Sequence, residues 1–272
     1  MTTTASQEAF LKTFHAEQPA LTADVLGRGR ASDGRTSYQI LCDRVAGSSR
    51  VLDLGCGDGL LLELLAAVGG RELAGIDLSP EALALARSRP GLSGTTLVVG
   101  RAQHLPFDDY SFDACVSHMA LMLMSDVEQV VAEIARVLSS GGVLACVLGG
   151  GIAGDAYERF RSLLTSAIET LPAARRIPAL GDRRTRTRDG LDDLLGPAGF
   201  EPVDWETIAI DLSGTAEQVW AAVSGVYDMG PLEQEARAAL RDSFLDEARA
   251  MAPSGGHVPC TFRVHVATAR LR

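Results

Sequence analysis

The stretch that decides the fold is Val51-Leu-Asp53-Leu-Gly55-Cys-Gly57-Asp-Gly59. It predicts a short apolar strand, Val51 to Leu54, that stops at a glycine-rich turn and is followed by an apolar helix from Leu60 to Val68. Because glycine has no side chain, a turn of this kind lets a ligand lie directly against the backbone. The turn is therefore the first candidate for a binding site.

Two classes of ligand use such a turn, dinucleotides and S-adenosylmethionine. The dinucleotide fingerprint G-x-G-x-x-G places its last glycine where this chain has Leu60. Here the glycines alternate instead, and Asp53 precedes them. A carboxylate at that point suits the ammonium of a methionine tail and is poorly placed beside a pyrophosphate. Asp77 ends the next predicted strand, where an acidic side chain can accept both ribose hydroxyls.

Strands and helices alternate on the carboxyl side of the turn. Ser79 is a predicted N-cap and Pro80 suits the first position of a helix. This alternation predicts a parallel sheet with helices on both faces and a ligand site at the carboxyl edge of its strands. A further helix is predicted from Val127 to Leu138. The further predicted strands are Leu73 to Asp77, Thr96 to Val99, Phe112 to Ser117 and Val143 to Leu148.

The flanking segments are less regular. Phe10 and Phe14 lie on one face of a predicted helix, and a second helix is expected from Thr36 to Val45. Gly149 to Gly151 and Gly154 predict a flexible joint. Helices are expected beyond the joint, and Pro259 to Leu271 predicts a closing strand. We expect a single domain, 1–272, made of a helical cap (1–47), a core (48–150), a lid insertion (151–190) and a closing part (191–272).

Between Arg35 and Leu148 the chain resembles class I S-adenosylmethionine-dependent methyltransferases, in particular the ubiquinone/menaquinone-biosynthesis-like group that acts on small molecules. The resemblance implies an α/β, Rossmann-like three-layer sandwich with a seven-stranded, mostly parallel sheet whose last strand is antiparallel. It rests on Val51 to Gly59, Gly75-Ile-Asp77-Leu-Ser-Pro80, Gln103-His-Leu-Pro-Phe107, Ser111-Phe-Asp113 and Arg136-Val-Leu-Ser-Ser-Gly-Gly142.

The same resemblance assigns S-adenosyl-L-methionine as the cofactor and S-adenosyl-L-homocysteine as its product. In this family an acidic residue commonly follows the glycine that ends the third strand and receives the adenine amino group. This chain has Arg101 after Gly100, so Gln103 or a backbone carbonyl would take that bond. The residues implied to contact the cofactor are Arg35, Tyr38, Asp53, Gly55, Cys56, Gly57, Asp77, Leu78, Ala102, Gln103 and Ser117.

His118 is the candidate general base, because it follows Ser117 at the ligand edge and histidine is easily tuned near neutral pH. A packed histidine is the alternative. The resemblance implies that the first helix, which holds His15, caps the site, and we interpret His15 as a solvated histidine of that helix. The basic run Arg183 to Arg188 is interpreted as a solvated loop, with binding of an anionic substrate as the alternative. No spacing typical of metal ligands is present, so no metal is expected.

The composition disfavours two classes of binding partner and indicates the cellular compartment. A formal charge of −10 repels phosphate backbones and anionic membranes, so we expect neither nucleic acid nor a membrane as a partner. The five cysteines are odd in number and form no C-x-x-C pair, which favours buried thiols in a reducing compartment. No signal peptide and no apolar run of about 20 residues is found. We therefore expect a cytoplasmic protein.

The sequence thus predicts transfer of a methyl group from S-adenosylmethionine to O, N or C of a small-molecule acceptor. We expect the rate to come mainly from positioning and exclusion of water, with base assistance from His118 where the acceptor loses a proton. Three alternatives stay open. They are a cyclase or isomerase of the same fold that transfers no methyl, a nicotinamide-dependent oxidoreductase, which Leu60 disfavours, and a non-catalytic binding protein. A homodimer is a further open alternative.

Overall fold

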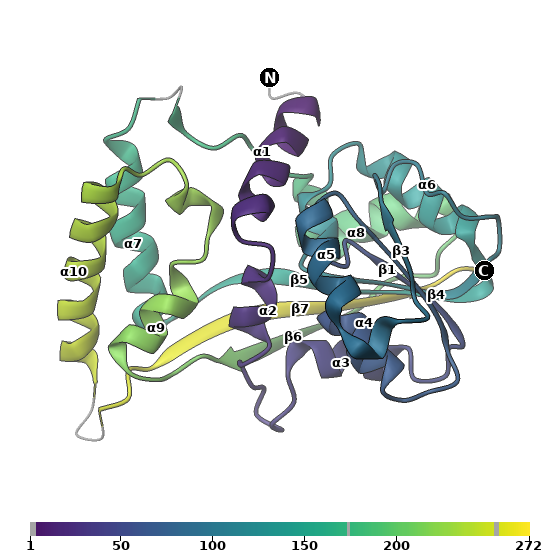
Figure 1. Cartoon of the computed structure of the whole chain (residues 1–272), viewed down its shortest axis with the longest axis horizontal. Helices are drawn as coiled ribbons and strands as arrows, with labels where there is room; N and C mark the ends of the chain where they lie inside the picture. Colours follow the sequence, from purple (N-terminus) through teal and green to yellow (C-terminus); the bar gives the residue numbers. More distant parts are fainter. Residues whose placement is uncertain (1–3, 173–174, 253–255) are drawn as a thin grey trace.

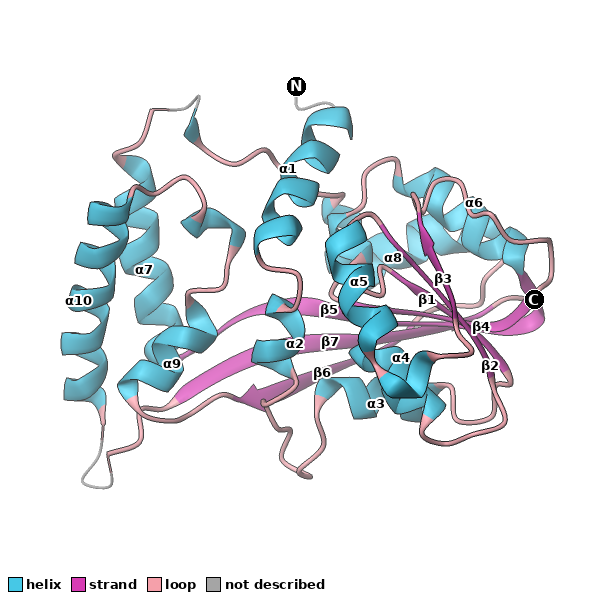
Figure 2. Cartoon of the chain, in the orientation of Figure 1, coloured by secondary structure: helices cyan, strands magenta, loops and turns pink. Residues whose placement is uncertain are grey.

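The chain is built around one sheet of seven strands in the order β3-β2-β1-β4-β5-β7-β6 (Figures 1 and 2). A computed structural model describes residues 4–172, 175–252 and 256–272. Strand β7 is antiparallel to both of its neighbours, and the other strand pairs are parallel, which confirms the predicted fold class. The strands are β1 (Arg50–Leu54), β2 (Glu72–Asp77), β3 (Thr96–Val99), β4 (Phe112–His118), β5 (Leu138–Gly154), β6 (Asp204–Asp211) and β7 (Cys260–Arg270).

Helices cover both faces of this sheet and give it three layers (Figure 2). Side chains alternate between the faces of a strand, and neighbouring residues of β1 enter different cores. Val51 packs in the cluster that includes Leu41 and Leu62, whereas Leu52 packs in the cluster that includes Val130 and Ile134. The covering helices are α3 (Ser37–Arg44), α4 (Leu60–Ala66) and α5 (Pro80–Ser88) on the first face, and α6 (Val127–Val137) and α8 (Arg188–Leu195) on the second.

Capping residues explain where several helices begin. Ser79 Oγ accepts a hydrogen bond from the Ala82 backbone N–H at 3.1 Å, and Pro80 occupies the first turn of α5, as predicted. Thr36 starts α3 through a capping box with Gln39. The helix α1 (Thr4–Glu17) confirms the predicted first helix, whereas the short α2 (Leu21–Leu26) was not predicted.

Strand β5 differs most from the prediction, because the expected flexible joint is part of the strand. Gly149 pairs with Val264 of β7, and the register shifts before Ile152 pairs with Phe262. A Cβ on Gly150 would lie 3.0 Å from the carbonyl of Arg263, so the glycine allows close approach of the two backbones. The prediction of a joint was wrong because these glycines serve strand pairing.

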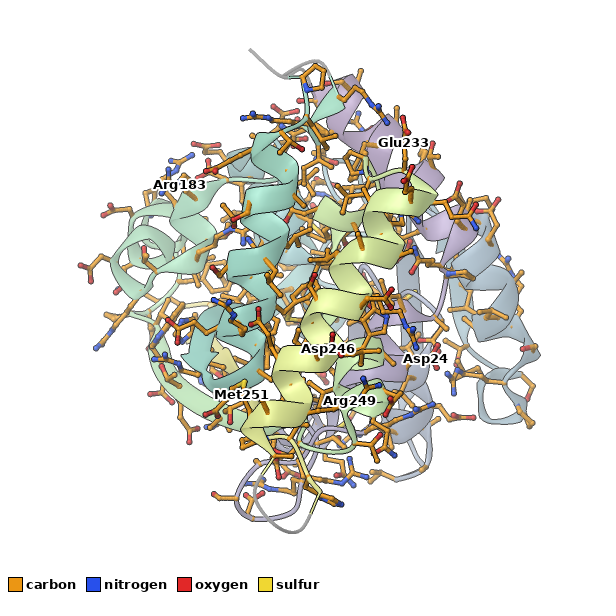
Figure 3. All side chains as sticks on the ribbon, turned by 90° about the vertical axis from the view of Figure 1, so that its left-hand side faces the viewer. Asp24, Arg183, Glu233, Asp246, Arg249 and Met251 are labelled. Atoms are coloured by element: carbon orange, nitrogen blue, oxygen red, sulfur yellow. The ribbon has the colours of Figure 1, made fainter. Side chains whose placement is uncertain are left out.

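The extension of β5 and β7 carries a separate helical layer at the left of Figure 1. This layer consists of α7 (Asp155–Glu169), α9 (Ala216–Val223) and α10 (Gln234–Met251) around a third apolar cluster centred on Phe160 and Phe244. In Figure 3, α7 and α10 lie side by side, and Arg249 on the outer surface pairs with Glu217 and Asp246. No described helix has both the length and the apolar character that crossing a membrane requires.

Candidate cofactor and acceptor site

The turn after β1 has the backbone that its glycines allow. Gly55, Gly57 and Gly59 have φ values of 75°, 52° and 81°, in the left-handed region that favours glycine. A Cβ on Gly55 would lie 2.4 Å from Ala120 Cβ, whereas one on Gly57 would meet nothing within 4 Å. Gly57 lines a cavity, so the bare backbone of the turn faces open space as predicted for a ligand-binding turn.

Asp77 at the end of β2 holds this turn in place. Its Oδ2 accepts a hydrogen bond from the Gly57 backbone N–H at 2.8 Å, and its Oδ1 accepts one from the Ser79 N–H at 2.8 Å. Each carboxylate oxygen can accept a second bond. Asp77 lines both of the small cavities described below, so its remaining acceptor capacity is available to a ligand.

Asp53 is the most unusual group at this edge of the sheet. Its side chain is 1% exposed, and neither carboxyl oxygen has a hydrogen-bond partner among the described residues. Burial, reinforced by the charges of Asp77 and Asp58, raises the pKa of this carboxyl well above its ordinary value. An unpaired buried carboxyl is costly, and Asp53 lines a cavity from which a cation could reach it.

Two small cavities meet at the turn. The first, of about 90 Å³, is bounded by Asp77 and Leu78 and is covered by Glu8, Leu11 and His15 of α1. The second, of about 80 Å³, lies over Asp53 and the glycine turn. Gly55 and Asp77 line both. The predicted residues that line the first cavity are Gly55, Asp77, Leu78, Ala102 and Gln103, and those that line the second are Tyr38, Asp53, Gly55, Cys56, Gly57, Asp77 and His118.

Gln103 and Arg101 show how the chain departs from the family pattern beyond β3. Gln103 is buried, and its Nε2 donates a hydrogen bond to the Ser125 carbonyl at 2.7 Å. Its Oε1 is the acceptor that this geometry leaves for a ligand. Arg101 forms an ion pair with Glu8 at 2.7 Å, and Glu8 also lines the first cavity.

His118 is enclosed. Its ring stacks on Tyr38 with centroids 3.7 Å apart and an interplanar angle of 14°, and its Nε2 lies 2.9 Å from Ser37 Oγ. Its Nδ1 is buried and has no hydrogen-bond partner among the described residues. Burial lowers the pKa of His118 to about 3, so the imidazole is neutral at physiological pH.

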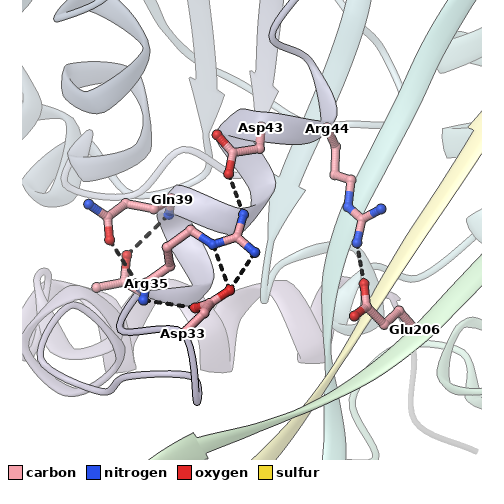
Figure 4. A network of polar contacts seen from close by, with 7 residues as sticks. Asp33, Arg35, Gln39, Asp43, Arg44 and Glu206 are labelled. Atoms are coloured by element: carbon pink, nitrogen blue, oxygen red, sulfur yellow. Dashed lines mark hydrogen bonds and ion pairs between the residues drawn. The ribbon is translucent and has the colours of Figure 1, made fainter.

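Two predicted cofactor contacts lie outside both cavities. Ser117 is fully buried, where its Oγ donates to the Leu54 carbonyl at 2.9 Å and accepts from the Leu121 N–H at 3.1 Å. Arg35 projects from the start of α3 and pairs with Asp33 and Asp43, as Figure 4 shows. Ser117 therefore links the end of β1 to the segment after β4, and Arg35 secures a surface loop. Both stay predicted cofactor contacts, at positions outside the two cavities.

A much larger cavity, of about 920 Å³, adjoins the second one between the core and the helical layer of Figure 1. Most of its lining is apolar and includes Met119 and Met122 after β4. Arg161 lines it in an ion pair with Asp228 at 3.1 Å, and Arg186 lines it as well. Arg186 is exposed, in line with the interpretation of the basic run as a solvated loop, and because it also lines the cavity the alternative, binding of an anionic substrate, stays a prediction.

His15 and Tyr227 lie where the cavities meet. His15 lines all three of them, and Tyr227 lines the second and the third. His15 Nε2 is 3.1 Å from Tyr227 Oη. The interpretation of His15 as a solvated histidine was wrong, because a residue more than 200 positions away packs against it. No signal in the local sequence marks either side chain as part of the site.

The described part of the chain holds no group of three or more histidine, cysteine or acidic side chains arranged to bind a metal ion. Four of the cysteines are buried, all five are free, and burial raises the pKa of Cys146 to about 12. The groups available for chemistry among the described residues are therefore the polar side chains that line the cavities.

Known proteins resemble this chain chiefly through its core. Residues 52–146 match the family model described as a methyltransferase domain. A malonyl-[acyl-carrier protein] O-methyltransferase of Methylococcus capsulatus is 41% identical over 99 residues, which are 36% of this chain and 36% of that protein. A demethylmenaquinone methyltransferase of Thermobifida fusca is 36% identical over 132 residues, 47% of this chain and 55% of its own. The chain thus spans less than two thirds of either relative.

Solved structures resemble the chain over almost its whole length. The [4+2]-cyclase SpnF aligns with 98% of this chain and 97% of its own at a TM-score of 0.61 and 20% identity. Phosphoethanolamine N-methyltransferase 2 of Haemonchus contortus, solved with phosphomonomethylethanolamine and S-adenosylhomocysteine, aligns with 98% of this chain and 60% of its own, at a TM-score of 0.59 and 17% identity. Residues 52–146 are therefore similar to a methyltransferase domain, and the chain as a whole shares the fold of these solved structures.

Proposed function

We propose that this chain transfers a methyl group from S-adenosylmethionine to O, N or C of a small-molecule acceptor. One observation carries the proposal, the buried carboxyl of Asp53 whose two oxygens have no partner among the described residues. An ammonium group beside Asp53 would supply both the missing charge and the missing hydrogen-bond donors. The methionine tail of the cofactor carries such a group.

The other donors and acceptors around the turn fit the rest of this molecule. Asp77 would accept hydrogen bonds from the ribose hydroxyls, and Leu78 and Ala102 would pack on the adenine. Gln103 would accept a bond from the adenine amino group. The two cavities together are smaller than ordinary ligand sites of about 300–1,000 Å³. We therefore expect α1, which covers the first cavity, to move outward when the cofactor enters.

The site can promote methyl transfer by holding two reactants in line and excluding water. The cofactor supplies a methyl group bound to a positively charged sulfur. The chain supplies the glycine turn and the two carboxylates that orient it, next to the cavity of about 920 Å³ in which the acceptor would lie. Base assistance from His118 stays a prediction, and the low pKa of its enclosed imidazole makes it a weak base.

The large cavity supports an acceptor that is big and mostly apolar. Ile177 to Leu180 and Arg186 line it, which favours our expectation that residues 151–190 act as a lid over the acceptor. The relatives named for malonyl-acyl-carrier-protein O-methylation and for demethylmenaquinone methylation lend support to a biosynthetic acceptor with a small reacting group.

Binding and product mass test the proposal. Calorimetry should detect binding of S-adenosylhomocysteine to the chain, and NAD should not compete for the same site. Incubation with S-adenosylmethionine and an accepted substrate should give a product heavier by one methylene. A product with the substrate's own mass would point to the cyclase or isomerase alternative instead. Failure to bind either form of the cofactor would refute the proposal.

Replacing Asp77 by asparagine should weaken binding of S-adenosylhomocysteine roughly tenfold, because hydrogen bonds to a charged acceptor are stronger than those to a neutral amide. Asparagine keeps one acceptor for the Gly57 or Ser79 N–H, so the turn should still fold. Calorimetry would measure the affinity, with the exposed Asp108→Asn as the matched control. An unchanged affinity would remove Asp77 from the ribose site.

A further inference from the structure

The pair formed by His15 and Tyr227 has no role in the proposed function so far. His15 lies in the last turn of α1, and Tyr227 begins the short helix η6 (Tyr227–Met229) more than 200 residues later. Both side chains reach the boundary between the proposed cofactor cavity and the large acceptor cavity. A group at this boundary would contact the acceptor atom that receives the methyl group.

Packing fixes the two rings. Phe14 lies 4.6 Å from Tyr227 between ring centroids, Phe10 lies 6.1 Å from it, and Phe14 meets the His15 ring edge-on at 5.5 Å. The hydrogen bond of 3.1 Å between His15 Nε2 and Tyr227 Oη is therefore held by Phe14, which contacts both rings, and by Phe10, which contacts Tyr227. A proton-transfer group needs this kind of fixed geometry.

The charges around the pair favour a neutral imidazole beside a protonated phenol. Burial lowers the pKa of His15, while the nearby charge of Asp77 acts in the opposite direction. Burial and Asp77 raise the pKa of Tyr227, against which the charge of Arg186 acts. A neutral imidazole accepts a proton, and a protonated tyrosine donates one. Burial weakens His15 as a base as it does His118, but the negative charge of Asp77 would stabilise the imidazolium of His15, and no described carboxylate does this for His118, so the pair can pass a proton from Tyr227 to His15.

Arg186 adds a positive charge to the same cavity. Its side chain donates to the Met122 carbonyl at 3.2 Å, and among the described residues no carboxylate forms an ion pair with it. Arg161, in contrast, is already paired with Asp228 across the same cavity. An unpaired guanidinium next to the proton-transfer pair would stabilise negative charge on an acceptor oxygen.

We propose that Tyr227 and His15 form a proton relay for a hydroxyl acceptor, and that the acceptor is a large apolar molecule with an acidic hydroxyl, a phenol or an enol. The inference rests on the proposed function. The acceptor O–H proton passes to Tyr227 Oη while the Tyr227 proton passes to His15 Nε2. The acceptor oxygen bonds to the transferred methyl carbon as the carbon–sulfur bond breaks, leaving a neutral thioether. The imidazolium then returns its proton through Tyr227 or to water.

The test uses two probes that differ in acidity but hardly in shape, methylumbelliferone and its difluorinated derivative. At about pH 6.5 the first carries its proton and the second is already ionised, so only the first needs a base. With S-adenosylmethionine and the full chain, both should give methyl ethers by mass spectrometry, and apolar amines of similar size should not react. Tyr227→Phe should lower kcat for methylumbelliferone on the order of 10²-fold and change kcat for the ionised probe little.

The control variants separate the relay from a structural role. Tyr110→Phe and His104→Gln alter exposed residues and should leave both rates unchanged, whereas His15→Gln should resemble Tyr227→Phe. An equal loss for both probes in Tyr227→Phe, or transfer to amines and to neither hydroxyl probe, would overturn the relay. Calorimetry distinguishes failure of the relay from failure of the proposed function. Loss of the relay leaves binding of S-adenosylhomocysteine intact. Absence of that binding in the unmodified chain would refute the proposed function itself.

Discussion

Replacing Asp53 by asparagine is expected to weaken binding of S-adenosylhomocysteine on the order of 10²-fold, because a buried ammonium would lose the one carboxylate of the second cavity that has no other hydrogen-bond partner among the described residues. The same change should make the ligand-free protein more stable, by about 1–2 kcal/mol at neutral pH. Calorimetry measures the first effect and urea denaturation the second. Opposite signs for affinity and stability are the signature of a group kept for its ligand.

The pH dependence of the free energy of unfolding tests independently whether Asp53→Asn stabilises the ligand-free chain. Burial raises the pKa of Asp53 in the folded chain above its unfolded value of about 3.9, so the folded chain binds the extra proton. The resulting penalty is absent below the unfolded pKa, grows as the pH rises toward the folded pKa, and is complete above it. The stability advantage of Asp53→Asn over the unmodified chain should therefore increase from about pH 4 to pH 7.

Ligand binding should reverse this proton uptake. An ammonium beside Asp53 favours the ionised carboxyl, so binding of S-adenosylhomocysteine should release protons at any pH where Asp53 of the ligand-free chain is still partly protonated, seen as a heat that depends on the ionisation enthalpy of the buffer. The variant should release none from this group, and the exposed Asp108→Asn should behave like the unmodified chain. Equal proton release by Asp53→Asn and the unmodified chain would show that Asp53 does not face the ammonium.

Local patterns were enough to predict the core of the fold and the glycine turn. The strand at Val51, the N-cap at Ser79 and the closing strand all follow from features within a few residues of one another, whereas the antiparallel direction of that strand was implied by the family resemblance. Asp53, Gly57 and Asp77 could be predicted as site residues because the turn brings them together with few tertiary contacts. Residues that a local motif positions are the ones that sequence reasoning identifies.

The sequence could not reveal what distant segments contribute. Whether Gly149 and Gly150 form a joint or a strand depends on β7, which lies more than 100 residues away. His15 is a surface residue in isolation and becomes part of the site only when Tyr227 packs on it. Arg35 stays a predicted cofactor contact, and the sequence did not reveal that Asp33 and Asp43 bind it locally.

The second large effect is expected in the helical layer that walls the acceptor cavity. Phe160 is fully buried at the centre of this layer, 5.9 Å from the ring of Phe244 and 5.9 Å from that of Trp220. Phe160→Ala should lower the free energy of unfolding by about 3–5 kcal/mol, since the cavity left by the ring cannot close completely. Urea denaturation followed by near-ultraviolet circular dichroism would measure it, with Val68→Ala, at a site 67% exposed, as the control.

The damage should stay on the acceptor side of the molecule. No residue of the apolar cluster around Phe160 lines either cavity beside the glycine turn, whereas Tyr157 and Val226, which pack against it, line the acceptor cavity. We therefore expect faster amide exchange in α7, α9 and α10, and a higher KM for the acceptor, with an unchanged affinity for S-adenosylhomocysteine below the unfolding transition. A parallel loss of that affinity would mean that the cofactor cavities and the acceptor cavity fold as one unit. It would contradict the inference that the glycine turn binds the cofactor independently of the helical layer.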